Sequence, residues 1–289
     1  MDANTRDIVF TRYDGRRGIG WLRESYRMFS AHRLGWISML AGYYAALIVV
    51  DVVPWIGVFI APMIKPVLSV GFLAAAWTQE RGGKPSLRML LRGFGANLAA
   101  LLPLGFIFVV GISIAIAATA LIDGGRLLEM LYGAAPAGDA DPTGAARSVQ
   151  QTLASTNVQL AMLFGALCAL PTILALWWAP ALVVFQDAPL LAALGASLRA
   201  SIANWRAALR YALGVFTLGA IVPTLVTTGI ALVVPPPLNA TIAALIVLPY
   251  LAFFVATLHI ADYVSYRDVF HAGETLAPIG GSDPTGTQR

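Results

Sequence analysis

Six apolar runs, each long enough to cross a lipid bilayer, divide this chain of 289 residues. A spanning helix needs roughly 20 mostly apolar residues to cross about 30 Å of hydrocarbon. The runs do not alternate apolar and polar residues as the strands of an outer-membrane barrel do. The sequence therefore predicts an all-α membrane protein with six transmembrane helices. The predicted spans are Leu34–Val53, Trp55–Thr78, Leu98–Ile122, Val158–Phe185, Ala207–Val234 and Leu238–Tyr263.

The residue composition supports this fold class. Charged residues make up 12% of the chain, whereas soluble domains carry about 25%. So apolar a sequence excludes both a water-soluble globule and a disordered chain. The single cysteine, Cys168, excludes a disulfide scaffold and a metal cluster held by cysteines. We expect no cofactor.

Basic residues lie almost entirely on one side of the predicted spans. They precede the first span and occupy the loops after the second and fourth, whereas the opposite side holds only Arg126 and Arg147. Because Lys and Arg favour cytoplasmic loops, we expect both termini in the cytoplasm and the loop 123–157 outside. All basic residues except Lys65 and Lys84 are arginine, which favours a GC-rich bacterial genome and hence the inner membrane. The net charge of +4 is then a topology signal, and we expect no nucleic-acid partner.

Three similar units account for the predicted membrane domain, residues 18–271. Each unit begins with a short amphipathic segment, which predicts a helix in the membrane interface, and continues with a hairpin of two spans. Each amphipathic segment ends with an arginine, three residues, an alanine, and then His or Asn. The arginines are Arg27, Arg92 and Arg199, and the last residues are His32, Asn97 and Asn204. The units are residues 18–80, 85–186 and 187–270, with 123–157 as an insertion in the second.

The segments outside these units are short. Residues 1–17 predict a basic cytoplasmic tail, and residues 272–289 predict a flexible cytoplasmic tail. Gly15–Gly20 predicts a flexible basic linker that touches anionic lipid headgroups.

Two further patterns predict where side chains lie in the bundle. Aromatic residues near the cytoplasmic ends of the spans, including Trp36, Trp178, Trp205 and Tyr263, are expected at the membrane interface. Stripes of small residues predict that two spans pack closely. They are Gly111-x3-Ala115-x3-Thr119 and Ala161-x3-Gly165-x3-Ala169.

Five short stretches carry a resemblance to known proteins. They are Ser25–Leu34, Pro66–Phe72, Trp178–Phe185, Ser197–Ser201 and Ser265–Phe270. With them the chain resembles a family of uncharacterised proteobacterial multi-pass inner-membrane proteins. The layout is similar, more distantly, to the membrane module that precedes some bacterial glycerophosphodiester phosphodiesterase domains. The resemblance implies a fold and a location, and it brings no catalytic residues.

Two ionisable residues lie within the outer half of the predicted spans, Asp51 and Lys65. Such groups are costly in lipid and by default indicate a function. One interpretation is a structural ion pair inside the first hairpin, because a lysine side chain can extend outward along its helix. The other is a polar site on a transport path. The sequence leaves both open.

Four residues near the end of the sixth span have a spacing that can place metal ligands on one helical face. They are His259, Asp262, Asp268 and His271. Because metal sites of this kind bring ligands from several elements, we favour an interfacial helix with local ion pairs to Arg267. We therefore predict no metal site.

These observations favour a non-enzymatic interaction or envelope-maintenance module that acts on membrane lipids or on other membrane proteins. The alternative is a small-solute transporter or channel that uses Lys65 and Asp51. A weaker third option is a lipid-modifying enzyme centred on His259, Asp262 and His271. The sequence names no substrate and no oligomeric state.

Overall fold

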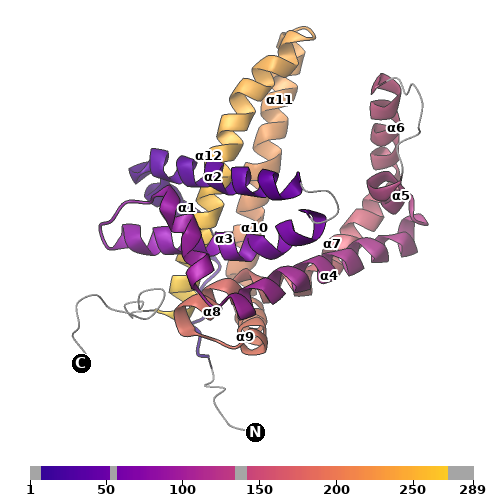
Figure 1. Cartoon of the computed structure of the whole chain (residues 1–289). Coiled ribbons are helices and arrows are strands. Elements are labelled where there is room, and N and C mark those ends of the chain that lie inside the picture. The colour runs from indigo at the N-terminus through magenta and orange to yellow at the C-terminus, as the bar shows by residue number, and fades with distance from the viewer. Residues whose placement is uncertain (1–7, 53–56, 134–141, 273–289) are drawn as a thin grey trace, which may run out of the picture. The chain divides into compact units, whose positions relative to one another are not determined.

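A computed structural model describes residues 8–52, 57–133 and 142–272. These ranges contain helices and no strand (Figure 1). The elements are α1 (Arg16–Ala31), α2 (Arg33–Asp51), α3 (Gly57–Glu80), η1 (Leu87–Gly95), α4 (Leu98–Asp123), α5 (Arg126–Tyr132), α6 (Pro142–Ala154), α7 (Thr156–Trp177), α8 (Ala179–Gln186), α9 (Leu190–Ala203), α10 (Trp205–Phe216), η2 (Thr217–Ile221), α11 (Val222–Val233) and α12 (Leu238–Phe270). η1 is a 3₁₀-helix and η2 is a π-helix.

Six helical stretches of the described residues are long and apolar enough to cross a membrane. They are α2, α3 from Ile60 onward, α4, α7 with α8, α10 with η2 and α11, and α12. The six predicted spans are confirmed as helices of this kind. The last one continues past the predicted end at Tyr263 to Phe270.

The chain divides into two compact units. One contains the described residues up to Gly105 and from Ala175 onward, and the other is Phe106–Leu174. The second unit comprises parts of α4 and α7 with α5 and α6, so the described residues of the predicted insertion 123–157 include the helices α5 and α6.

Small residues bring α4 and α7 close together within the second unit. A Cβ atom at Gly165 would lie 2.6 Å from Thr119 Cγ2, and one at Gly111 would overlap the side chain of Thr172. Only residues without bulk allow such an approach. The predicted small-residue stripes are confirmed.

Aromatic side chains from distant parts of the sequence form the core of the first unit. Trp36, Trp178 and Tyr263 are fully buried. Trp36 Nε1 donates a hydrogen bond of 2.8 Å to Gln79, and Trp178 Nε1 donates one of 3.0 Å to Ser265. The rings of these three residues are therefore covered by protein and do not face lipid headgroups, which differs from what the sequence had led us to expect. Their depth in the membrane stays a prediction.

The first amphipathic segment is helical but packs against protein. α1 begins at Arg16 and buries Trp21, Ser25 and Phe29. Gly18 lies so close to α10 that an added Cβ atom would overlap the Ala207 carbonyl oxygen. The predicted flexible linker at Gly15–Gly20 is therefore wrong, because this segment forms the first turns of a packed helix.

The other two amphipathic segments expose apolar side chains. η1 exposes Leu87, Leu91 and Phe94, and α9 exposes Leu191 and Ile202. The buried face of α9 consists of small residues instead. It comprises Ala193, Ala196, Ser197, Ala200 and Ser201.

The predicted polar residues His32, Asn97 and Asn204 each precede a spanning helix. His32 separates α1 from α2, and Asn204 separates α9 from α10. Asn97 follows η1, and its side-chain oxygen accepts a hydrogen bond of 3.2 Å from the N–H of Ala100. Asn97 thus caps the first turn of α4.

The π-helix in the fifth span has a local cause. Its backbone bonds join residues five apart, and the N–H of Val222 donates to the Thr217 carbonyl. In this register the next donor is residue 223, which is a proline and has no N–H. The Leu218 carbonyl instead accepts a hydrogen bond of 2.6 Å from the hydroxyl of Tyr250 on α12.

Candidate functional site

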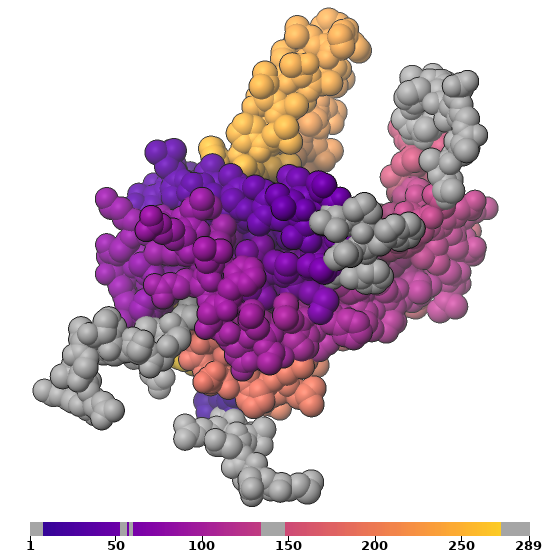
Figure 2. All heavy atoms as spheres, viewed as in Figure 1, coloured from indigo at the N-terminus to yellow at the C-terminus, as the bar shows by residue number. Residues whose placement is uncertain are grey.

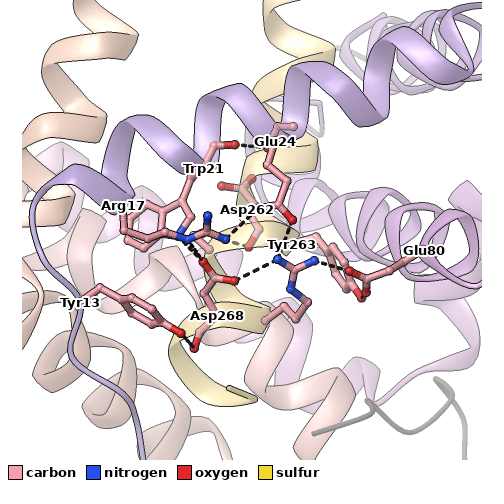
Figure 3. A network of polar contacts seen from close by, with 11 residues as sticks. Tyr13, Arg17, Trp21, Glu24, Glu80, Asp262, Tyr263 and Asp268 are labelled. Atoms are coloured by element: carbon pink, nitrogen blue, oxygen red, sulfur yellow. Dashed lines mark hydrogen bonds and ion pairs between the residues drawn. The ribbon is translucent and has the colours of Figure 1, made fainter. Parts of the chain in front are cut away.

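Five charged side chains from three helices meet at the end of α12 (Figure 3). Arg17 and Glu24 come from α1, Glu80 ends α3, and Arg267 and Asp268 belong to the last turn of α12. We call these five residues the charged cluster. It joins the beginning of the described chain to its last helix.

Asp268 is the most buried member, with its side chain 8% exposed. Its Oδ2 atom accepts hydrogen bonds from Arg17 Nε and, at 2.9 Å, from Trp21 Nε1. Its Oδ1 atom accepts one of 2.9 Å from Arg267 Nη2. These donors offset the loss of hydration that burial imposes on a carboxylate.

Arg267 connects all three helices of the cluster. Its Nη2 atom lies 2.7 Å from Glu24 Oε1, and its Nη1 atom donates to Glu80 Oε1. The hydroxyl of Tyr263, one turn earlier on α12, donates to the other oxygen of Glu80. The planar guanidinium holds several carboxylates at fixed angles, which a lysine cannot do.

Arg17 completes the network from α1. Its Nη2 atom lies 2.7 Å from Glu24 Oε2. The hydrogen bond to Asp268 raises the pKa of Arg17 above its ordinary value, and Glu24 acts in the same direction. Arg17 therefore stays positive, and every carboxylate of the charged cluster has an arginine partner.

Asn204 fixes the segment before α1 next to the cluster. Its Oδ1 atom accepts a hydrogen bond of 2.8 Å from the N–H of Tyr13, and its Nδ2 atom donates one of 3.0 Å to the Thr11 carbonyl. The N–H of Thr11 donates to the Val269 carbonyl at 2.7 Å. The described part of the predicted tail 1–17 is thus bound to the membrane domain.

Comparison with known proteins agrees with the six apolar helices. The chain is 28% identical over 275 residues to a protein of Burkholderia thailandensis described as a probable inner membrane protein. The match covers 91% of this chain and 94% of the relative. This chain is a multi-pass inner-membrane protein. No family model and no solved structure matches it.

The predicted arginines of the repeat pattern are exposed and lie outside the charged cluster. Arg27, Arg92 and Arg199 all have exposed side chains. Of the predicted repeat residues, Asn204 alone contacts the cluster's surroundings, through the segment before α1. The pattern located helix ends and did not locate the ionic network.

Asp51 and Lys65 do not form an ion pair in this structure. In the described residues, neither side chain takes part in an ion pair, in contrast to the side chains of the charged cluster. Asp51 at the end of α2 and Lys65 within α3 are both exposed. A role for either residue in a transport path stays a prediction.

The four residues considered as metal ligands have separate surroundings. His259 stacks on Phe72 at 4.1 Å between ring centroids, Asp262 accepts a hydrogen bond from Trp177, and Asp268 belongs to the charged cluster. His271 shares a hydrogen bond of 2.8 Å with the hydroxyl of Tyr266. Within the described ranges, no group of three such side chains is placed to hold a metal.

Sequence reasoning missed most of the charged cluster. It expected ion pairs of Arg267 with its neighbours, and the contact with Asp268 confirms this. It did not single out Glu24 or Glu80, and it counted Arg17 as a topology signal and as part of the basic linker Gly15–Gly20. A signal for Asp268 was available, because a carboxylate that an apolar helix carries into a packed core is costly and requires a partner.

Proposed function

We propose that this protein is a non-enzymatic interaction or envelope-maintenance module of the inner membrane, acting on lipids or on other membrane proteins. The observation that carries this proposal is the internal pairing of the charged cluster. Its carboxylates accept hydrogen bonds from Arg17 and Arg267, so the most conspicuous polar network holds helices together. General acid or base catalysis needs a group that can reach a substrate proton, and paired groups of this kind are suited to structure instead.

Exposed apolar helix surface supports contact with lipid or membrane proteins. α11 and the first half of α12 expose large side chains, including Leu225, Leu232 and Leu245. Figure 2 shows the end of this helix pair, in orange and yellow, open to its surroundings. In the described residues of this hairpin, apolar surface of this kind fits a lipid environment.

The proposed topology has both termini in the cytoplasm and the segment 123–157 on the outer side. The distribution of Lys and Arg along the sequence supports it. Reporter fusions after Gly83, Leu194 and Gly280 should behave as cytoplasmic, and one after Gly138 as periplasmic. A cytoplasmic signal at Gly138 would contradict this topology.

We propose further that the chain arose from three units of amphipathic segment plus hairpin. Support comes from the equivalent positions of His32, Asn97 and Asn204, each directly before a spanning helix. Exchange of His32 for Asn should then leave folding intact, because the other two units use Asn at this position. Aggregation of His32→Asn with normal behaviour of Asn97→His would argue against equivalent units.

Co-purification tests the main proposal. The tagged full chain is extracted from native membranes in mild detergent, and lipids and proteins that stay bound are identified by mass spectrometry. A tagged inner-membrane protein with six spans and known independence from partners is the control. We expect specific lipids or proteins to exceed the control. Retention equal to the control would contradict the proposal.

Transport of a small solute is the second candidate. Lys65 favours it, because this exposed cation lies in a spanning helix between Pro62 and Pro66, where backbone bonds are interrupted. Reconstituted protein should then conduct ions or exchange solutes across liposomes, and Lys65→Met should reduce the flux. A solute and ion flux across liposomes with the protein that is no greater than across empty liposomes would contradict this alternative.

A further inference from the structure

An apolar groove lies between α1, α10 and α12 within the first unit. Its volume is about 830 Å³, in the range of sites that bind small molecules. The groove is lined by one face of each helix. The lining residues fall within Ile19–Tyr26, Arg210–Leu218 and Tyr250–Thr257.

Three of the hydroxyl groups that line the groove, those of Thr217, Tyr250 and Thr257, are bonded to the helices themselves. Thr217 and Thr257 each donate to a carbonyl in the preceding turn, at 2.8 Å, and Tyr250 donates to the Leu218 carbonyl within the π-helix. Large apolar side chains such as Leu213 and Phe253 stay exposed along the wall. The groove therefore offers a hydrocarbon chain a surface with few free polar hydrogens.

Two arginines line the same groove, Arg23 from α1 and Arg210 from α10. Both are exposed, and in the described part of the chain neither belongs to an ion pair. They differ in this from Arg17 and Arg267 of the charged cluster. Unpaired guanidinium groups beside apolar surface match a ligand that combines a phosphate with hydrocarbon.

We propose that this groove binds an anionic phospholipid, with Arg23 and Arg210 on the phosphate and an acyl chain along Leu213 and Phe253. The wall from Arg210 to Leu218 contains nine residues, whose first and last Cα atoms are separated by about 12 Å along a helix. That length suits part of an acyl chain and exceeds what a phosphate needs. The inference rests on the proposed function and names its lipid class.

Native mass spectrometry of the purified full chain tests this inference. The protein is delipidated in mild detergent and mixed with phosphatidylglycerol, with phosphatidylcholine of the same chains, or with inorganic phosphate. We expect phosphatidylglycerol to be retained in preference to phosphatidylcholine, and inorganic phosphate to be retained weakly. Retention of inorganic phosphate as strong as that of the lipid would overturn the assignment of the groove to an acyl chain.

Charge-matched variants locate the site. Arg23→Gln with Arg210→Gln should weaken retention of phosphatidylglycerol by roughly 25-fold, about fivefold for each arginine. Arg27→Gln with Arg206→Gln is the control, because it removes the same charge from the same two helices outside the groove lining. Equal losses in both double variants would overturn the inference, since they would reflect total charge.

A third variant tests the apolar wall. Leu213→Trp enlarges an exposed side chain of the groove and should reduce retention of both phospholipids while leaving thermal unfolding unchanged. Undiminished retention would overturn the groove as the binding site. A wild-type protein without preference for phosphatidylglycerol would overturn this inference alone, because co-purification of other lipids or proteins decides the proposed function separately.

Discussion

The two halves of α12 belong to one continuous helix and lie in opposite environments. Leu245 and Leu248, in the first half, are 71% and 64% exposed, whereas Ile260, Tyr263 and Tyr266 in the second half are fully buried. A helix of 33 residues is about 50 Å long, more than the roughly 30 Å of hydrocarbon that a span must cross. One helix therefore serves first as a span and then as a core element.

Along α12, burial and polarity increase together, opposite to their usual relation in a soluble domain. The exposed half of α12 is apolar, and the buried half carries Asp262, Arg267 and Asp268. Lipid tolerates exposed leucine but not an exposed carboxylate, whereas other helices can supply partners for a buried one. The charged cluster depends on that supply.

Asp268→Ala should lower the free energy of unfolding more than any other change considered below. The substitution removes the carboxylate that accepts hydrogen bonds from the buried Trp21 Nε1, from Arg17 Nε and from Arg267 Nη2. Breaking a buried ion pair on one side costs about 3–5 kcal/mol, so we expect a large fall in the free energy of unfolding, measured by denaturant titration in detergent micelles. Asp51→Ala removes an exposed acid and serves as the control. A fall no greater than that of the control would show that the cluster is not structural.

Ile260→Ala and Leu248→Ala make a matched pair on the two halves of α12. The first opens a cavity in a packed core and should cost about 2–5 kcal/mol. The second shortens an exposed side chain and should change the unfolding free energy by roughly 0.5 kcal/mol or less. Equal losses would mean that the first half of α12 packs against a protein surface, and the division into a span and a core element would fail.

Gly18→Ala should cause the next largest loss of stability, because its new methyl group would overlap the Ala207 carbonyl and push α1 away from α10. Overpacking of this kind costs roughly 1–3 kcal/mol. Gly229→Ala is the control, since nothing lies within 4 Å of an added Cβ there and the change favours the helix. Thermal unfolding followed by circular dichroism separates the two. An unchanged midpoint for Gly18→Ala would return this segment to the flexible linker expected from sequence.

Hydropathy was enough to locate the six helices, because a span must satisfy its backbone internally and so must be long and apolar. It could not place Trp36 and Trp178, since a tryptophan near a helix end suits a lipid headgroup or a protein core equally well. Gln79, which is half-buried, and Ser265, which is buried, accept their N–H groups, but only contacts between distant segments reveal these partners.

Only the part of the charged cluster that is local in sequence could be predicted. Arg267 and Asp268 are neighbours in sequence, and their contact follows from local helix geometry. Glu24 lies 243 positions from Arg267, so no periodicity connects them. The π-helix was accessible in principle, because Pro223 removes a backbone donor inside an apolar run, although sequence does not say that Tyr250 replaces it.

Lys65→Leu should have the smallest effect on the free energy of unfolding. The sign of that effect decides whether Lys65 is unpaired or forms an ion pair with Asp51. Lys65 is exposed in α3, about 12 Å along the helix from Gly57. A lysine in the middle of a span costs on the order of 2.5–3.5 kcal/mol on insertion scales. If Lys65 faces lipid or headgroups unpaired, Lys65→Leu keeps or raises the unfolding free energy in bicelles, and Asp51→Asn adds nothing further. If the two residues pair in the membrane, Lys65→Leu lowers stability and the double variant recovers much of the loss. The exposed side chains and the absence of an ion pair between them in the described residues lead us to expect the first outcome, and a recovery in the double variant would contradict it.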